Sequence, residues 1–432
     1  MKKKTKIRHK VSILTLGCSK NIVDSENLIG LLDYNDIEIC ENIRKAESIV
    51  INTCGFIADA KEESASVILE AVNMKRQGLV KQIIVMGCFS QRYIDILDKD
   101  SLGVDYIFGV NSNEEVLRAI KRKDKYHIRN VRRLLTPPHY AYLKIAEGCN
   151  RECSFCAIPI IRGKYISTPA DELVTETKQL VQAGVKEINV IAQDTTYYGR
   201  DFDGKSHLVK LLDRLSDVDG VERLRLQYTY PAGFPTDVLD LIASKPNICN
   251  YIDIPFQHFS DKILKSMRRG TKSEYIMNLV ETIRERIPDV AIRSTFIVGY
   301  PGESEDDFEQ LYNFIAEAKL DRVGVFTYSH EDDTYAYKLT DTVIEEEKIR
   351  RKEEIMLLQQ KISLAKNKEK INNIYRVLVD GITDDGYVGR TEHDAPDVDN
   401  MVYFTSARKH KPGDFVEVKI TDASEYDLFG RG

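Results

Sequence analysis

Three cysteines close together in the sequence carry the strongest chemical signal. Cys149, Cys153 and Cys156 form a C-x-x-x-C-x-x-C run, so a single loop can direct three thiolates at one metal centre. A zinc ion would need a fourth protein ligand, and His127 and His139 lie upstream without the spacing of a zinc finger. An iron–sulfur cubane held by three cysteines leaves one iron open to another ligand. The run therefore favours such a cluster over a structural zinc loop.

A second set of three cysteines is spread along the first part of the chain. Cys18, Cys54 and Cys88 are about 35 residues apart, and each follows an apolar run typical of a buried strand. The carboxyl ends of parallel strands share one sheet edge, so the three thiols are expected to converge there. Isolated buried cysteines are the alternative, but three equivalent positions favour a second cluster with an open iron. Cys40 and Cys249 lie outside both sets and are expected to be small buried or partly exposed residues.

The elements that must position the second set alternate between strand and helix patterns, which predicts a doubly wound parallel sheet. The expected strands are residues 12–16, 48–52, 82–86 and 106–110, and the expected helices are residues 24–33, 58–77, 90–98 and 114–121. Residues 121–133 are rich in Lys and Arg and are followed by Pro137 and Pro138. We interpret this basic segment as a solvated linker in preference to an RNA-binding patch.

Six further strand–helix units predict a partial TIM-like (β/α)6 barrel, or a closely related open form. The expected barrel strands are residues 142–146, 187–192, 223–228, 251–255, 292–298 and 323–328. The cysteine run comes directly after the first of them, at the carboxyl end where barrel active sites lie.

The end of the chain changes character. A charged helix over residues 344–370 is expected to pack on the barrel as an amphipathic brace, because its apolar seam is too short for a coiled coil. Short strands then predict a small all-β barrel module, at residues 375–380, 386–390, 401–405 and 415–421. The predicted fold class is α/β, with domains over residues 1–133, 134–368 and 369–432.

Composition bounds the cellular setting. The chain has 432 residues, a net charge of -6 and 8 cysteines. A chain of this length does not need disulfide bonds to be stable. It holds no apolar run of the roughly 18 residues that span a membrane, and the apolar run after the basic start is too short for a signal peptide. We therefore expect a cytoplasmic protein with reduced thiols, in which clustered cysteines bind metal or take part in catalysis.

Together these residues resemble the methylthiotransferase family of radical S-adenosylmethionine (SAM) enzymes over essentially the whole chain, including its C-terminal TRAM module. Within the family, Ser19-Lys20-Asn21 after Cys18 is similar to the branch that modifies an aspartate of small-subunit ribosomal protein twelve. The tRNA-modifying branch typically has Gln and Met after that cysteine. Further segments similar to the ribosomal-protein branch are residues 15–18, 23–26, 52–57, 192–196 and 389–396.

The resemblance implies SAM and two 4Fe-4S clusters as cofactors. The implied cluster ligands are the two cysteine sets, Cys18, Cys54 and Cys88, and Cys149, Cys153 and Cys156. SAM contacts are expected at the carboxyl ends of barrel strands, where we select Gln193, Gln257 and Gly299. Other polar groups expected at these ends are Asp194, Tyr228, Tyr230, His258 and the loop 299–303. His258 is either a proton relay or a structural histidine, and no side chain is assigned as catalytic.

The implied reaction replaces a C–H bond by a C–S bond, which only a cofactor can achieve. The barrel cluster, reduced by one electron from a donor such as a flavodoxin or ferredoxin, cleaves SAM to a 5′-deoxyadenosyl radical. This radical takes hydrogen from the β-carbon of the target aspartate. Sulfur from the second cluster is then delivered to that carbon, and a separate SAM supplies the methyl group. The two clusters are therefore expected to face each other across a domain interface.

Two other functions compete with this one. Methylthiolation of a tRNA adenosine would use the same clusters, but residues 368–432 contain nine basic and thirteen acidic side chains. That balance favours a basic protein substrate over a phosphate backbone, although residues 408–411 could form a local phosphate patch. A non-enzymatic iron–sulfur carrier would need neither a six-unit barrel nor clusters with an open iron.

Overall fold

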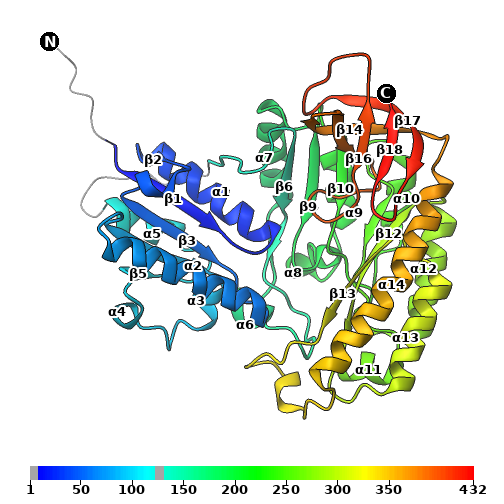
Figure 1. The fold of residues 1–432 in the computed structure, drawn as a ribbon, viewed down its shortest axis with the longest axis horizontal. Coiled ribbons are helices and arrows are strands. Elements are labelled where there is room, and N and C mark those ends of the chain that lie inside the picture. The colour runs from blue at the N-terminus through cyan, green and yellow to red at the C-terminus, as the bar shows by residue number, and fades with distance from the viewer. Residues whose placement is uncertain (1–7, 122–130) are drawn as a thin grey trace. The chain divides into compact units, whose positions relative to one another are not determined.

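The computed structural model describes residues 8–121 and 131–432, which pack as two compact units (Figure 1). The N-terminal unit comprises the chain up to Leu135 together with Cys156–Lys164. The barrel unit comprises Thr136–Phe155 and Tyr165–Gly432. Most of the basic segment predicted as a linker, and His127 with it, falls outside the described residues.

The N-terminal unit is built on a five-stranded sheet in the order β2-β1-β3-β4-β5, with all neighbours parallel. Its strands are β1 (Lys10–Thr15), β2 (Glu38–Ile39), β3 (Ser48–Thr53), β4 (Gln82–Gly87) and β5 (Tyr106–Ile107). The doubly wound parallel sheet predicted from the sequence is thus confirmed. Two edge details differ, because β2 was not predicted and β5 has two residues where five were expected.

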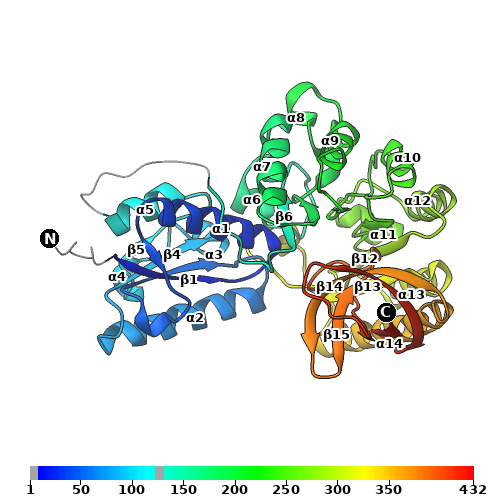
Figure 2. The same ribbon diagram turned by 90° about the horizontal axis from the view of Figure 1, so that it is seen from above.

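Helices cover both faces of this sheet, as Figure 2 shows. The helices of the unit are α1 (Ser19–Tyr34), α2 (Ala58–Arg76), α3 (Cys88–Arg92), α4 (Lys99–Leu102), α5 (Asn113–Lys121) and α6 (Ile158–Arg162), with a 3-10 turn η1 (Ile43–Lys45). Val50 and Ile84 pack against α1 and α5, whereas Ile49 and Ile83 pack against α2. Alternate residues of β3 and β4 therefore enter opposite cores, which explains why both strands are apolar throughout.

The helix predicted over residues 90–98 is wrong. The structure ends α3 at Arg92 and begins a separate helix, α4, at Lys99. The Asp98 carboxylate accepts a 2.8 Å hydrogen bond from the backbone N–H of Ser101. Because this is the N-cap interaction that starts a helix, the chain turns before Asp98 and does not continue from α3.

Six parallel strands form the partial barrel. They are β6 (Tyr140–Lys144), β9 (Glu187–Ile191), β10 (Arg223–Leu226), β11 (Tyr251–Asp253), β12 (Ala291–Val298) and β13 (Arg322–Thr327). They pair as two three-stranded sheets, β10-β9-β6 and β11-β12-β13. The sheets are joined beyond the end of β10, where the Thr229 N–H donates to the Asp253 carbonyl over 2.9 Å. The predicted six-unit partial barrel is confirmed.

Helices between these strands complete the β/α units. They are α7 (Ala170–Gln182), α8 (Arg200–Asp203), α9 (Leu208–Ser216), α10 (Asp237–Ser244), α11 (Asp261–Ser266), α12 (Ser273–Arg286) and α13 (Glu305–Ala318). Short elements add the hairpin-like pair β7 (Ala146–Glu147) and β8 (Ile166–Ser167) and the 3-10 turns η2 (Thr195–Tyr197) and η3 (Ala336–Lys338). The brace helix α14 (Glu345–Glu369) packs along β13, with Ile355 and Ile362 buried.

The C-terminal module is a closed five-stranded barrel in the order β14-β15-β16-β18-β17. Its strands are β14 (Ile374–Thr383), β15 (Gly386–Arg390), β16 (Val402–Thr405), β17 (Phe415–Ala423) and β18 (Leu428–Arg431). The last strand was not predicted, and it closes the barrel by pairing with β16 in parallel and with β17 in antiparallel.

This C-terminal barrel is fastened to the amino-terminal ends of the partial-barrel strands. Glu187, the first residue of β9, is fully buried between Arg225 and Arg390, with N–O distances of 3.2 and 3.0 Å. Arg322, the first residue of β13, pairs with Asp394 at 2.7 Å. The attachment lies at the opposite end of these strands from their carboxyl ends, so the side of the barrel expected to carry chemistry is left to other elements.

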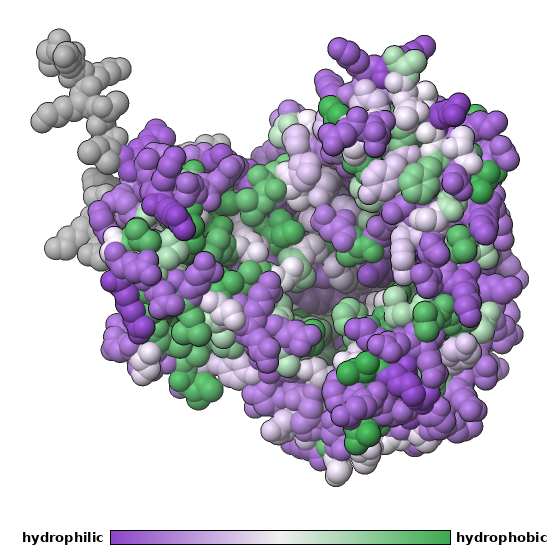
Figure 3. Space-filling view, viewed as in Figure 1, coloured by the Kyte–Doolittle hydropathy of each residue, from purple (hydrophilic) through white to green (hydrophobic). Residues whose placement is uncertain are grey.

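No helix among the described residues is long and apolar enough to cross a membrane. On the face drawn in Figure 3, apolar residues lie in small groups among hydrophilic ones.

Candidate iron–sulfur sites

Cys18, Cys54 and Cys88, here called the sheet-edge triad, lie at the carboxyl ends of three adjacent strands. Cys18 is the N-cap residue of α1 after β1, Cys54 follows β3, and Cys88 is the first residue of α3 after β4. Because β1, β3 and β4 are neighbours in one parallel sheet, the three positions share one edge. Cys18 is exposed, Cys54 is partly exposed and Cys88 is buried.

Glycines bring the backbone close to these thiols. Gly17 has φ +88, and a Cβ atom there would lie 2.8 Å from the Cβ and 2.9 Å from the Sγ of Cys54. Gly87 has φ +104, and a Cβ there would collide with Asn52 Oδ1. L-residues rarely adopt this backbone region. Glycine at both positions is therefore required by conformation and by space, and it leaves room for a group to approach Cys54.

Asn21 ties the loops of the triad together, a role that sequence reasoning missed. Its side-chain amide donates to the carbonyls of Leu16 and Thr53 over 2.7 and 3.2 Å. The backbone carbonyl of Asn21 accepts a 3.0 Å hydrogen bond from the side-chain amide of Asn52. These hydrogen bonds join the ends of β1 and β3, so Cys18 and Cys54 are held in a fixed relation.

The three thiols are close enough to influence one another electrostatically. Burial raises the pKa of Cys88 to about 11, Arg162 opposes that rise, and the neighbouring Cys18 and Cys54 add to it. Burial also raises the pKa of Cys54, again with a contribution from Cys18. Three thiolates held close together need positive charge nearby. A coordinating metal supplies that charge, and its thiol ligands are deprotonated as a result.

Across residues 8–121 and 131–432, no three Cys, His, Asp or Glu side chains converge tightly enough to share one metal ion.

Cys149, Cys153 and Cys156, here called the loop triad, follow β7 at the carboxyl side of the partial barrel. Cys149 and Cys153 belong to the barrel unit, whereas Cys156 opens the segment Cys156–Lys164 of the N-terminal unit. Burial raises the pKa of Cys149 to about 11, while the backbone N–H of Arg151, 3.4 Å from its Sγ, works in the opposite direction.

One arginine and one tyrosine contact Cys153, and a second arginine packs on the ring of that tyrosine. Arg269, which is buried, donates to the Cys153 Sγ from Nη1 over 3.2 Å, and the Tyr230 hydroxyl lies 3.6 Å from the same sulfur. The guanidinium groups of Arg151 and Arg269 lie 4.0 and 4.2 Å from the centre of the Tyr230 ring. Arg151 is in turn held by Asp194 at 2.7 Å. The sulfur therefore accepts a hydrogen bond from a buried guanidinium and lies beside an aromatic ring that two guanidinium groups face.

The candidate SAM residues lie beyond the ends of barrel strands. Gln193 donates from its side chain to Glu147 over 3.1 Å, and Glu147 also pairs with Lys144 at 2.7 Å. Gln257 has φ +76 and a buried side-chain oxygen that accepts no hydrogen bond from the described residues. The same is true of the side-chain oxygen of Gln193. Two buried acceptors of this kind suit a ligand that carries donor groups.

Gly299 has a packing role of its own. It has φ +75, and a Cβ there would collide with the Lys348 side chain of α14. The conformation and space at Gly299 thus serve the brace helix, and any contact with SAM would come from its backbone.

His258 is buried and structurally engaged. Its Nδ1 accepts a 3.0 Å hydrogen bond from the Ser260 N–H, and its Nε2 lies 3.6 Å from Glu303 Oε2. Glu303 is itself paired with Arg351 at 2.8 Å. This network supports the structural interpretation of His258.

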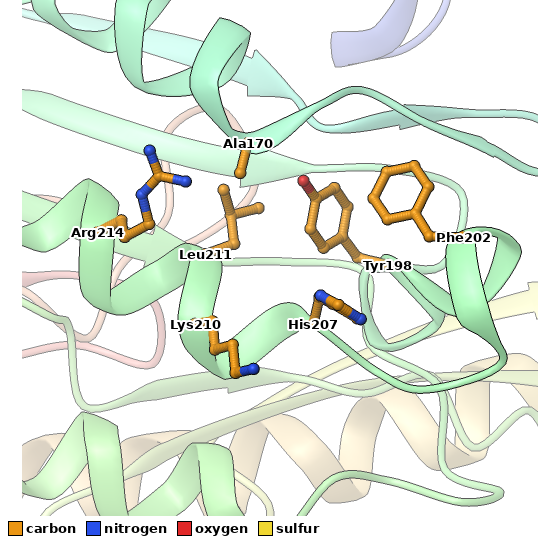
Figure 4. A pocket seen from close by; sticks show the side chains of 7 residues that line it. All are labelled: Ala170, Tyr198, Phe202, His207, Lys210, Leu211 and Arg214. Carbon is orange, nitrogen blue, oxygen red and sulfur yellow. The ribbon is translucent and has the colours of Figure 1, made fainter.

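A shallow surface pocket elsewhere in the barrel unit takes no part in either triad. Figure 4 shows its lining, which combines Tyr198, Phe202, His207 and Leu211 with two cationic residues, Lys210 and Arg214. It contains no cysteine and none of the candidate SAM residues.

Three family models match the chain. The radical SAM superfamily covers residues 143–315, the TRAM domain residues 371–432, and uncharacterized protein family UPF0004 residues 10–109. Among solved structures, the radical SAM methyltransferase TsrM from Kitasatospora setae has a TM-score of 0.56 at 15% identity, over 74% of this chain and 72% of that one. The fold and the cysteine loop thus define a radical SAM enzyme, with SAM and an iron–sulfur cluster as its cofactors.

Curated relatives narrow the assignment. Proteins from Cytophaga hutchinsonii and Flavobacterium johnsoniae are each 49% identical over 100% of this chain and 99% of their own. One from Chloroherpeton thalassium is 46% identical over 98% of both. All three are named ribosomal protein uS12 methylthiotransferase RimO. The chain belongs to the RimO family of radical SAM methylthiotransferases, as its resemblance to the methylthiotransferases predicted.

Proposed function

We propose that the chain adds a methylthio group to the β-carbon of an aspartate in ribosomal protein uS12. The observation that carries this proposal is similarity along the whole chain, at 46–49% identity, to enzymes named for that substrate. The two cysteine triads support the chemistry, because sulfur insertion and SAM cleavage are separate tasks.

The proposed cofactor set is SAM and two 4Fe-4S clusters, one on each triad. The loop-triad cluster, when bound, supplies the electron that cleaves SAM, and the sheet-edge cluster supplies an open iron for sulfur. In the proposed arrangement, the sheet-edge ligands belong to a domain over residues 1–133. The loop ligands lie within a radical SAM domain over residues 134–368, and of these ligands Cys156 packs with the N-terminal unit. Residues 369–432 form the TRAM domain.

The chain's own residues have separate parts in this scheme. Arg269 holds the Cys153 sulfur by a hydrogen bond, and Asn21 fixes the loops that carry Cys18 and Cys54. Gln193 and Gln257 are proposed to accept hydrogen bonds from SAM, with the backbone of Gly299 nearby. A flavodoxin or ferredoxin is proposed as the electron donor.

The acidic balance of the C-terminal module adds less to the substrate proposal than its total suggests. Several of its acidic side chains contact the partial barrel: Asp380 binds His139, Asp394 binds Arg322, Asp397 binds Tyr142 and Asp399 binds Tyr251. These carboxylates hold the two barrels together and are not free to meet a basic partner. The protein substrate is therefore proposed from the relatives, and not from the charge of this module.

The test is a substrate competition. Reconstituted protein, SAM and reductant are offered uS12 or tRNA separately, and each product is analysed by mass spectrometry. We expect a methylthio adduct on one aspartate of uS12 and none on tRNA. Modification of tRNA alone would establish the alternative function. If neither substrate is modified and no 5′-deoxyadenosine is released, the result would favour a carrier. Cys40→Ala serves as the matched control, because Cys40 lies outside both triads.

A further inference from the structure

Arg162 is the last residue of α6, which follows the loop triad in the chain but packs within the N-terminal unit. It is 6% exposed. A buried guanidinium always carries its charge and requires partners.

The partners of Arg162 come from the sheet-edge triad and its supports. Nη1 pairs with Asp24 Oδ2 at 2.8 Å. Nη2 donates to Asn21 Oδ1 over 2.6 Å and to Cys88 Sγ over 3.3 Å. The same side chain therefore binds one cysteine of the triad and the asparagine that links the loops of the other two.

Apolar packing fixes the position of this guanidinium. Ala157 and Ile161 of the α6 segment form a buried cluster with Cys88, against which Val110 packs. The thiol is thus enclosed by hydrocarbon on one side and faced by Arg162 on another. Charge placed in such a dry environment acts strongly on its neighbour.

We propose that Arg162 is a positioning residue of the sheet-edge cluster, which holds the Cys88 sulfur by a hydrogen bond and raises the reduction potential of that cluster. This rests on the proposed function, since it takes Cys88 as a cluster ligand. Reduction adds an electron, and a fixed positive charge and a hydrogen bond to a ligand sulfur both stabilise the more negative state. Asp24 orients the guanidinium and offsets part of its charge.

The test isolates one cluster. In a Cys149→Ala/Cys153→Ala background the loop triad loses two ligands that belong to the barrel unit, and residues 156–164 keep their native sequence. The protein is reconstituted with iron and sulfide, its iron is counted, and the midpoint potential is measured by electron paramagnetic resonance during titration with dithionite.

Arg162→Gln is expected to lower the potential by about 59 mV, which corresponds to a tenfold change in the ratio of reduced to oxidised cluster for one electron. Arg162→Lys keeps the charge and should recover at least half of that shift. Arg118→Gln is the matched control, because Arg118 pairs with Glu114 on the exposed side of α5 in the same unit. It should leave the potential unchanged.

Two results would overturn the inference: a potential in Arg162→Gln equal to that of the background protein, or equal shifts in Arg162→Gln and Arg162→Lys. If Arg162→Gln loses its iron while Arg162→Lys retains it at the background potential, the positioning role is supported. A background protein that binds no cluster at all would instead refute the two-cluster proposal, and this inference with it.

Discussion

The two cysteine triads, each proposed to hold a cluster, are assembled in opposite ways. The sheet-edge triad draws one thiol from the end of each of three strands, far apart in the sequence. The loop triad draws its thiols from a single stretch after β7. In the first, the sheet itself sets the spacing between ligands. In the second, the loop must be shaped by what surrounds it.

The supports differ accordingly. At the sheet edge, glycines with positive φ and the amide of Asn21 suffice to bring the ends of the strands together. In the loop, Ser154 is anchored from both its backbone and its side chain, to Met267 O at 3.0 Å and to the Tyr300 hydroxyl at 2.8 Å. The sheet-edge triad is thus shaped mainly by the backbone at the strand ends, whereas the loop triad is shaped by contacts with residues far away in the sequence.

One feature is shared. Each triad has one thiol in contact with a buried arginine, Cys88 with Arg162 at 3.3 Å and Cys153 with Arg269 at 3.2 Å. Both sites therefore place a guanidinium against a cysteine sulfur, and in both the arginine lies far away in the sequence.

The largest effect is expected from removing one ligand of each triad. Cys54→Ala should abolish methylthiolation while 5′-deoxyadenosine is still released, because the loop triad is intact. Cys153→Ala should abolish both methylthiolation and 5′-deoxyadenosine release. We expect each loss to exceed about 100-fold, which is the upper end of the effect of removing a supporting contact from a metal site. Liquid chromatography of both products checks this. Equal loss of 5′-deoxyadenosine in the two variants would remove the functional distinction between the triads.

The next largest effect tests whether the two compact units differ in stability. Glu187→Gln removes the buried carboxylate that Arg225 and Arg390 share and leaves Arg390 with the carboxylate of Asp380. It should lower the free energy of unfolding of the barrel unit by about 3–5 kcal/mol. Hydrogen exchange should show faster opening at β9 and β10 but unchanged protection at β3 and β4. Loss of protection in both units would mean that they unfold together.

The same carboxylate makes the barrel unit sensitive to acid. Burial opposes ionisation of Glu187, but Arg390, Arg225 and Arg223 outweigh it and lower its pKa from 4.5 to about 2. A lowered pKa means that the stabilisation is complete above about pH 4.5 and is lost as the pH falls towards 2. Denaturant unfolding between these pH values should show a falling stability in the parent. In Glu187→Gln that part of the slope should be absent.

A smaller effect tests the backbone of the sheet-edge triad. Gly17→Ala forces an L-residue into φ +88 and places a methyl group against Cys54, so it should cost more than the roughly 1–2 kcal/mol of the conformation alone. Gly78→Ala is the matched control, because Gly78 has φ +75 with nothing within 4 Å of the added Cβ. Iron bound by the sheet-edge triad should fall in the first variant only. Equal iron content would show that Gly17 does not shape the site.

The smallest effect concerns the shape of the loop. The Asn150 side chain, between Cys149 and Cys153, accepts a 2.9 Å hydrogen bond from the Tyr165 N–H. Asn150→Ala should destabilise the loop by about 1 kcal/mol, the usual worth of one such bond. Hydrogen exchange at Tyr165 should rise with no change at β4. An unchanged rate at Tyr165 would mean that the loop is held without this contact.

Much of the fold could be predicted from local pattern. The apolar runs that end at Cys54 and Cys88 are uniformly buried on both sheet faces, and such strands are visible in sequence. By contrast, β18 (Leu428–Arg431) has alternating burial over four residues and pairs with β16 on the far side of β17 in the sequence, so no local pattern indicates it. Boundaries set by a cap, as at Asp98, were also missed.

The positions of the six cysteines could be predicted, but not the side chains that support them. Cys149, Cys153 and Cys156 form a local run, and the strand patterns before Cys18, Cys54 and Cys88 place those three at one sheet edge. Asn21 and Arg162 are separated by 141 residues, and Arg269 and Cys153 by 116. Nothing near these residues indicates their partner. The acidic residues of the C-terminal module show the same limit, because the partners of several of them lie on or beside the strands of the partial barrel.

The boundary between the two compact units runs through the loop triad, between Phe155 and Cys156, and returns at Lys164. In a chimera that exchanges N-terminal units between relatives at residue 135 alone, residues 156–164 of one protein would therefore pack against the N-terminal unit of the other. Ile161 would face a foreign core and Arg162 a foreign counter-ion. A chimera with matched packing must exchange residues 156–164 together with the first 135. This nine-residue segment lies within the barrel part of the sequence, but it packs with the N-terminal unit.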